Sequence, residues 1–291
     1  MKTISMLVLV VLIAARTSAA DGAAPTPRPV PAAGDWKFVE TRRIPAPEAH
    51  QGVASDGEFI YAIGDHSLGK YRKSTGERAG GWECLKGEPL IHMNAGIVWR
   101  GVLYCAHSNF PGLPMTGSVE QFDPATMKPI GSRSFGRTDG SLTWIDRYQD
   151  GWVACFVHYG KAGGEPGRGP EWARLVQFDN EWRQMGGWTF PADLIAKLGT
   201  RGYSFSGGAF GPGGNLFVTG HDDAALHVLT IPTGGTTLQW TATIPIAANG
   251  QSFGWDPREP GTFYSIGRRT AEIIVGRVTN SKLANGQAAG R

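Results

Sequence analysis

The stretch His92–Asn109, HMNAGIVWRGVLYCAHSN, holds the pattern that decides the fold. One apolar run leads from His92 into the turn Trp99-Arg100-Gly101, and a second run leads back out to His107. Two short apolar runs joined by a glycine-containing turn are typical of paired antiparallel strands. The stretch therefore predicts a strand pair with one histidine at its start and another at its end.

Four further segments share this pattern of a polar start, two apolar runs around a Gly/Asp turn, and a polar end. They are residues 50–66, 141–159, 204–223 and 251–269. A second hairpin follows each of the first four pairs, and its turns align at Tyr71, Phe122, Phe178 and Leu229, which are 51, 56 and 51 residues apart. A period near 50 residues with four short strands per unit is the signature of a β-propeller. We therefore predict an all-β, five-bladed β-propeller.

The last blade lacks an outer strand, because only one weak strand, 272–278, follows its first pair. An open propeller would leave a bare sheet edge. Residues 36–40 precede the first blade and alternate like a strand. We predict that this N-terminal strand closes the propeller, and that deletion of residues 35–46 abolishes folding.

The chain divides into four parts. Residues 1–20 combine Lys2, an apolar run and a small-residue end, Ser18-Ala19-Ala20, which predicts a signal peptide and therefore a periplasmic or secreted protein. A Pro/Ala-rich leader (21–34), a single propeller domain (35–280) and a polar tail (281–291) follow. The apolar run of the signal is too short to span a membrane, and no cysteine at the cleavage site can take a lipid.

Charge and cysteine content narrow the classes of partner. Loss of Lys2 and Arg16 with the signal lowers the formal net charge from +3 to +1, and no run of basic residues remains. Nucleic acid is therefore not an expected partner. We separately expect a monomer. Of the three cysteines, Cys105 and Cys155 take similar second-strand positions where a buried thiol packs well. At most one disulfide can form among Cys84, Cys105 and Cys155, and we expect none because a propeller does not require it for stability.

Six of the seven histidines recur at two positions of the repeat. The start of the first strand carries His50 and His92, and the end of the second strand carries His66, His107, His158 and His221. Because the two strands are antiparallel, both positions open onto the same face of a propeller. Only His227, in a third strand, falls outside this scheme. The sequence predicts one functional face and one connective face.

Converging imidazoles can bind a divalent transition metal. We predict a divalent metal ion (Mn, Fe, Zn or Ca) held by His50, His107, His158 and His221, with Gln251 or Gln51 as a further ligand. No compact motif such as HExxH supports the metal, so the ligands would come from distant blades. The alternative is structural, with each histidine bonding a backbone carbonyl at a blade corner.

Polar and aromatic side chains line the same face and suit a hydroxylated or carboxylated small molecule. The predicted substrate-binding residues are Asn94, Thr143, Trp144, Ser206, Arg268 and Arg269. The two arginines offer a fork for a carboxylate, or alternatively a surface ion pair. His92 or Tyr159 is the predicted catalytic base. Two loops, a glycine-rich one at 159–172 and one at 108–114, form a lid and a wall over this face, or are mere spacers.

The segments Lys70–Glu77 and Gln121–Thr126 resemble the strand-turn-strand repeats of quinoprotein-like secreted bacterial propellers. Arg72 stands where an aspartate is usual, and nothing indicates a pyrroloquinoline quinone site. The radial histidines are similar to those of propeller enzymes such as oligogalacturonate lyase and the carotenoid oxygenases, which hold a metal through histidines. The resemblance covers architecture only and assigns no individual role.

The leading functional hypothesis is an exported, metal-dependent lyase or isomerase that acts on a sugar acid or other oxygenated small substrate in the central funnel. A metal-assisted hydrolase of lactones or esters uses the same parts. A non-catalytic carbohydrate-binding or scaffold propeller is the third interpretation, and metal content and ligand protection of the funnel separate it from the enzymes.

Overall fold

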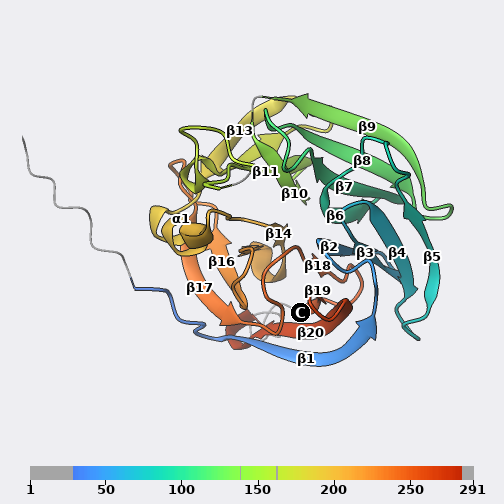
Figure 1. The fold of residues 1–291 in the computed structure, drawn as a ribbon. Helices are drawn as coiled ribbons and strands as arrows, with labels where there is room; N and C mark the ends of the chain where they lie inside the picture. The colour runs from blue at the N-terminus through green and yellow to red at the C-terminus, as the bar shows by residue number, and fades with distance from the viewer. Residues whose placement is uncertain (1–28, 138, 162, 284–291) are drawn as a thin grey trace, which may run out of the picture.

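The computed structural model describes residues 29–137, 139–161 and 163–283 and forms a ring of five four-stranded antiparallel sheets (Figure 1). The predicted all-β, five-bladed propeller is confirmed. In order around the ring, the blades are β2 (Gly52–Ser55), β3 (Phe59–Ile63), β4 (Ser67–Arg72), β5 (Arg78–Glu83); β6 (Met93–Trp99), β7 (Val102–Ser108), β8 (Gly117–Asp123), β9 (Lys128–Gly136); β10 (Ser141–Tyr148), β11 (Gly151–Val157), β12 (Arg174–Phe178), β13 (Gln184–Thr189); β14 (Gly207–Phe210), β15 (Leu216–Thr219), β16 (Ala225–Thr230), β17 (Gln239–Pro245); and β18 (Gly254–Trp255), β19 (Thr262–Gly267), β20 (Glu272–Asn280), β1 (Trp36–Pro45).

Each blade is most apolar near the axis and most polar at the rim. Strand β11, second from the axis, is buried along its whole length, whereas the rim strand β9 is almost entirely exposed. A strand covered on both faces has to be apolar throughout, which explains the short continuous runs in the sequence. The core consists of clusters between neighbouring blades, such as the one that joins Trp144 of the third blade to Phe205 and Val218 of the fourth.

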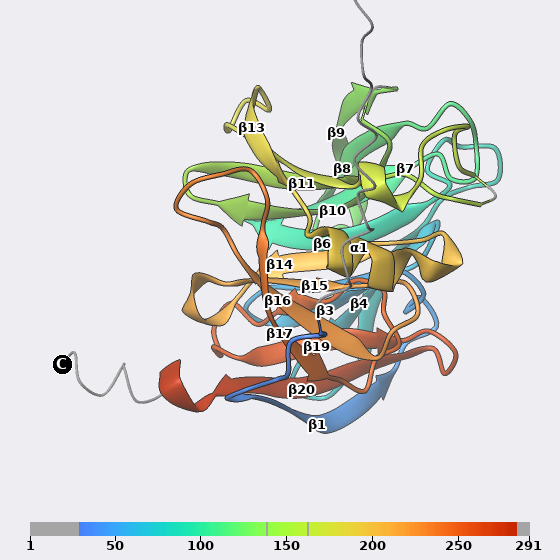
Figure 2. The same ribbon diagram turned by 90° about the vertical axis from the view of Figure 1, so that its left-hand side faces the viewer.

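Strand β1 closes the ring. It pairs antiparallel with β20 from Trp36 opposite Asn280 to Pro45 opposite Glu272, so that an N-terminal strand forms the rim of the fifth blade, as predicted. The views along and across the ring both show β1 beside β20 at the rim (Figures 1 and 2). The strand is longer than residues 36–40 because a bulge between Glu40 and Arg42 lets pairing continue to Pro45.

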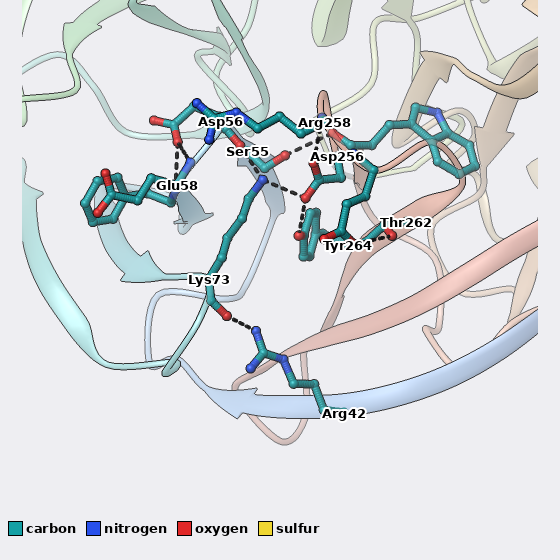
Figure 3. A network of polar contacts seen from close by, with 12 residues as sticks. Arg42, Ser55, Asp56, Glu58, Lys73, Asp256, Arg258, Thr262 and Tyr264 are labelled. Carbon is teal, nitrogen blue, oxygen red and sulfur yellow. Dashed lines mark hydrogen bonds and ion pairs between the residues drawn. The ribbon is translucent and has the colours of Figure 1, made fainter.

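A polar network ties the first blade to the last at this seam (Figure 3). One carboxylate oxygen of Asp256 accepts hydrogen bonds from Lys73 Nζ and Tyr264 Oη, both at 2.6 Å. The other accepts the backbone N–H groups of Arg258 and Glu259. The guanidinium of Arg42, on β1, donates to the Lys73 carbonyl. These residues, which we call the closure network, join three segments far apart in the sequence.

The remaining elements are short. The 3-10 turn η1 (Pro170–Trp172) lies between β11 and β12. Helix α1 (Ala192–Leu198) and the turn η2 (Gly199–Arg201) lie between β13 and β14, and η3 (Pro212–Gly214) lies between β14 and β15. Within the described ranges, no helix is long and apolar enough to cross a membrane. Cys84, Cys105 and Cys155 are unpaired. The predicted signal peptide lies outside the described residues, as do residues 21–28 of the leader and 284–291 of the tail.

Candidate functional site

The loops that follow second strands and precede first strands gather on one face, as the repeat predicted. His50 and His92 precede β2 and β6, and His66, His107 and His158 follow β3, β7 and β11. His221 follows β15, whereas His227 lies inside β16. The structure therefore places six histidines on the predicted face, although their side chains have very different surroundings.

A series of side-chain contacts runs around this face, with residues from all five blades. We call it the mouth ring; its members are Asp65, His92, Phe110, Tyr159, Tyr203, His221 and Arg268. The Asp65–His92 ion pair stands at one end of the series and Arg268 at the other, and the charge of Arg268 favours the ionised form of Asp65. A site held by every blade is fixed in shape before any ligand arrives.

Asp65 and His92 form a hydrogen-bonded dyad on one side of the ring. Asp65 Oδ1 lies 2.7 Å from His92 Nδ1 and also accepts a 2.7 Å hydrogen bond from the Gln51 amide. The Asp65 carbonyl accepts the N–H of Met93, which fixes the two loops together. Burial opposes ionisation of Asp65, but the hydrogen bond and charge of His92 lower the pKa of this carboxyl to about 2. With Nδ1 held by a carboxylate, Nε2 is the basic nitrogen of His92, and no described residue hydrogen-bonds it.

Aromatic rings form the next arc of the mouth. Phe110 packs between His92 and Tyr159, with ring centroids 5.0 and 5.1 Å away, and Tyr203 lies 5.6 Å from Tyr159. Burial raises the pKa of Tyr159 to about 12, so the phenol keeps its proton at neutral pH. Tyr159 contributes its ring to the wall of the site, and the choice of His92 or Tyr159 as the base stays a prediction.

The two loops singled out in the sequence support this arc together. A Cβ at Gly163, which has a positive φ of 80°, would lie 2.6 Å from the Phe110 ring, so only glycine lets the loops meet this closely. Glu165 accepts the N–H of Met115 at 3.1 Å. The loop at 108–114 contributes Phe110 to the mouth ring, and the glycine-rich loop packs against it.

The third arc is cationic. His221 stacks on Tyr203 at 4.4 Å, and its Nε2 lies 3.5 Å from Arg268 Nη1. Burial lowers the pKa of His221, and the Asp222 carboxylate, 3.1 Å from Nδ1, acts against this shift. His221 and Arg268 also line a cavity of about 440 Å³. Arg268 thus lies where the mouth ring adjoins this cavity.

The four histidines predicted as metal ligands have separate environments. His50 is exposed, and His158 is only 1 % exposed and lies 3.6 Å from Glu165. His107 is held by the Ile91 N–H and the Ser118 hydroxyl. Across the described part of the chain, no three His, Cys, Asp or Glu side chains are grouped to hold a metal ion. This arrangement does not fit the predicted four-histidine metal centre. His107 is instead bonded to the backbone, as in the structural alternative, but it accepts a backbone N–H where the prediction had it bond a carbonyl.

Four of the predicted ligand-binding residues make contacts that join or fill the blades. The amide of Asn94 donates to Leu142 O at 2.8 Å, and Thr143 Oγ1 donates to Phe205 O at 2.8 Å. The side-chain amide of Gln251 donates to His221 O at 3.4 Å, and its backbone carbonyl accepts Thr219 Oγ1 at 2.6 Å. Trp144 is fully buried in the core between the third and fourth blades. The hydrogen bonds satisfy backbone carbonyls in or next to the inner strands. Ser206 is half-buried, and its hydroxyl donates to Ser204 O.

Three members of the mouth ring were not among the predicted site residues: Asp65, Phe110 and Tyr203. Asp65 ends the first strand pair directly before His66, and Phe110 lies in the loop already proposed as a wall. Their positions in loops on the predicted functional face could have indicated them. Their contacts join loops of different blades, and the spacing of residues along the chain does not reveal such contacts.

Comparisons with known proteins support the fold. The chain is similar to a solved structure of luciferin-regenerating enzyme, with a TM-score of 0.53 and 13 % identity over 84 % of this chain and 96 % of that one. It is also similar to the PQQ-bound aldose sugar dehydrogenase of Streptomyces coelicolor, with a TM-score of 0.52 and 11 % identity over 86 % and 100 % of the two chains. No protein-family model matches the sequence, and no curated protein matches it either. At this identity the likeness shows a propeller fold that enzymes share, and nothing of the site.

Proposed function

We propose that the mouth ring binds an oxygenated small molecule with a carboxylate, such as a sugar acid, and that His92 removes a proton from it in an elimination or isomerisation. The observation that carries this proposal is the dyad of Asp65 and His92 on the same face as Arg268, whose charge acts on Asp65. A base and a carboxylate anchor on one face are the two parts that proton abstraction next to a carboxylate requires.

Binding would use the three arcs in different ways. The faces of Phe110 and Tyr203 offer apolar area to the C–H groups of a sugar. Arg268 is exposed and has no hydrogen-bonded carboxylate among the described residues, so its guanidinium is available for a bidentate contact with a substrate carboxylate. Because Asp65 and Gln51 hold His92 in place, little order has to be gained on binding.

In the reaction, His92 Nε2 takes the proton from the carbon next to the carboxylate, and Arg268 stabilises the negative charge that builds on the carboxylate oxygens. For elimination, the C–H electrons form a C=C bond, and the bond from the neighbouring carbon to its oxygen substituent breaks. That oxygen takes a proton from water, and the His92 imidazolium gives its proton to the hydroxide that remains. For isomerisation, His92 returns the proton to a different carbon. Asp65 stays ionised and stabilises the imidazolium.

The proposed reaction is written without a metal ion, because the predicted histidine ligands do not converge within the described residues. The alternative, a metal-assisted hydrolase, would need such a group of ligands. The predicted signal peptide further leads us to propose that the reaction takes place in the periplasm or outside the cell.

A panel of sugar acids tests the function, with elimination followed by the ultraviolet absorbance of the conjugated product. We expect His92→Gln to lower kcat by about 10²- to 10⁴-fold and Asp65→Asn to lower it by less, because the imidazole remains. His66→Gln is the matched control, since this exposed histidine lies outside the mouth ring. Full activity in His92→Gln would overturn the proposal. Ligands that bind without turnover would favour the carbohydrate-binding alternative.

A further inference from the structure

A second cationic site adjoins the mouth ring. The cavity of about 440 Å³ lies between the fourth and fifth blades and is lined by four arginines, Arg43, Arg201, Arg268 and Arg269. They come from β1, η2 and the turn between β19 and β20. Only one carboxylate, that of Asp222, lines the cavity with them. Four guanidinium groups around one cavity are costly unless anions balance them.

The four arginines differ in how they are partnered. Arg43 is neutralised by Glu40 and Glu272, at 2.8 and 3.0 Å. Arg201 lies 3.7 Å from Asp222, at the edge of ion-pair distance. Arg269 forms no ion pair or hydrogen bond with any described residue, and Arg268 contacts His221 and acts through its charge on Asp65. Two adjacent guanidinium groups therefore remain available to an anion.

The cavity is continuous with the mouth ring, because His221 and Arg268 belong to both. A ligand whose carboxylate meets Arg268 in the ring can extend past His221 toward Arg269 and Arg201. We propose that this cavity is a second anion subsite, and that the substrate carries a second anionic group, a carboxylate or a phosphate, at the end away from the reacting carbon. This inference rests on the proposed function for the position of the first carboxylate.

Three matched ligands test the subsite by isothermal titration calorimetry on the purified protein. Gluconate carries one carboxylate, glucarate adds a second on the same carbon skeleton, and 6-phosphogluconate adds a phosphate instead. We expect at least one of the two dianions to bind about tenfold more tightly than gluconate, and the tighter one identifies the second group. The gain should shrink as the salt concentration rises, because exposed charges are screened.

The variant Arg269→Gln should remove this gain while the affinity for gluconate stays unchanged. Arg277→Gln is the matched control, since it removes the same charge from an exposed residue that does not line this cavity. Equal affinity for all three ligands, no binding of any of them, or the same loss in Arg277→Gln would overturn the subsite. Calorimetry measures binding and not turnover. A dianion that binds through Arg269 but is never converted would therefore support the subsite and contradict only the proposed catalysis.

Discussion

Replacement of Asp256 by asparagine should weaken the closure of the ring severely. The Asp256 side chain is 3 % exposed and accepts four hydrogen bonds, two of them from Lys73 Nζ and Tyr264 Oη. The asparagine keeps the shape and one acceptor oxygen but turns an NH₂ group toward donors. It also leaves the ammonium of Lys73, which is 15 % exposed, without its carboxylate.

The loss follows from burial. Removal of one member of a buried ion pair costs about 3 to 5 kcal/mol, because the other charge stays desolvated. Lys73 keeps some access to water and a hydrogen bond to the Asp56 carbonyl, so we expect about 3 kcal/mol. For a domain of this size, that corresponds to a melting temperature lower by about 6 to 12 °C.

Urea unfolding, followed by tryptophan fluorescence, and thermal scans measure the effect. The control is Glu58→Gln, which breaks the exposed ion pair with Arg72 nearby and should cost less than about 1 kcal/mol. A loss below about 1 kcal/mol in Asp256→Asn, or an equal loss in the control, would refute the assignment of the network to ring closure.

The pH dependence of stability, compared between wild type and Asp256→Asn, gives a second test. Burial favours the protonated acid, but hydrogen bonds from Lys73 and Tyr264 lower the pKa of Asp256 below its ordinary value of 3.8. A carboxyl with a lowered pKa stabilises the folded state above its ordinary pKa and loses that effect as the pH falls through the folded value. The difference in stability between wild type and Asp256→Asn should therefore be constant near neutral pH and shrink below about pH 4.

Three further predictions concern folding and its pH dependence. Deletion of residues 35–46 removes all of β1 and bares β20, so the protein should not fold, and a native-like circular dichroism spectrum would contradict this. Burial raises the pKa of Asp146 to about 7, so wild type should lose stability relative to Asp146→Asn as the pH rises from about 4 to 7; parallel curves would contradict the assignment. Burial lowers the pKa of His227 to about 4, so wild type should lose on the order of 3 kcal/mol relative to His227→Gln as the pH falls from about 6.5 to 4, and a difference independent of pH would show that His227 does not cause it.

The sequence predicted the fold because the repeat is simple. Each blade needs two apolar inner strands and a turn, so the pattern around His92–Asn109 recurs with a period that only a propeller explains. The closing strand was predictable as well, because the fifth blade lacked one. The same period placed six histidines on one face, since both repeat positions open onto it.

The repeat could not predict what each side chain contacts. His66 and His158 take analogous positions, yet one is exposed and the other is 1 % exposed, because the glycine-rich loop with Glu165 covers only the second. Asn94 and Thr143 looked like ligand-binding residues because they are polar and near the axis. They instead bond carbonyls of the next blade, a need that arises only when the strands are assembled.

The repeat predicted only part of the candidate site. His92 and Arg268 were predicted from their positions, and both belong to the mouth ring. Asp65 is the partner that makes His92 a candidate base, but the two are joined across different blades. Contacts between loops of different blades depend on the packing of the ring, and spacing along the chain does not encode them.

The most direct test of the account is proton exchange in D₂O, followed by proton NMR of glucarate with the purified protein. If His92 removes this proton, the signal of the hydrogen next to the carboxylate disappears with catalytic amounts of wild-type protein. His92→Gln should lose this exchange, and His66→Gln should keep it. Exchange that persists at the wild-type rate in His92→Gln, or a ligand that binds in the mouth ring with no exchange at all, would contradict the claim that His92 and Asp65 form a catalytic dyad.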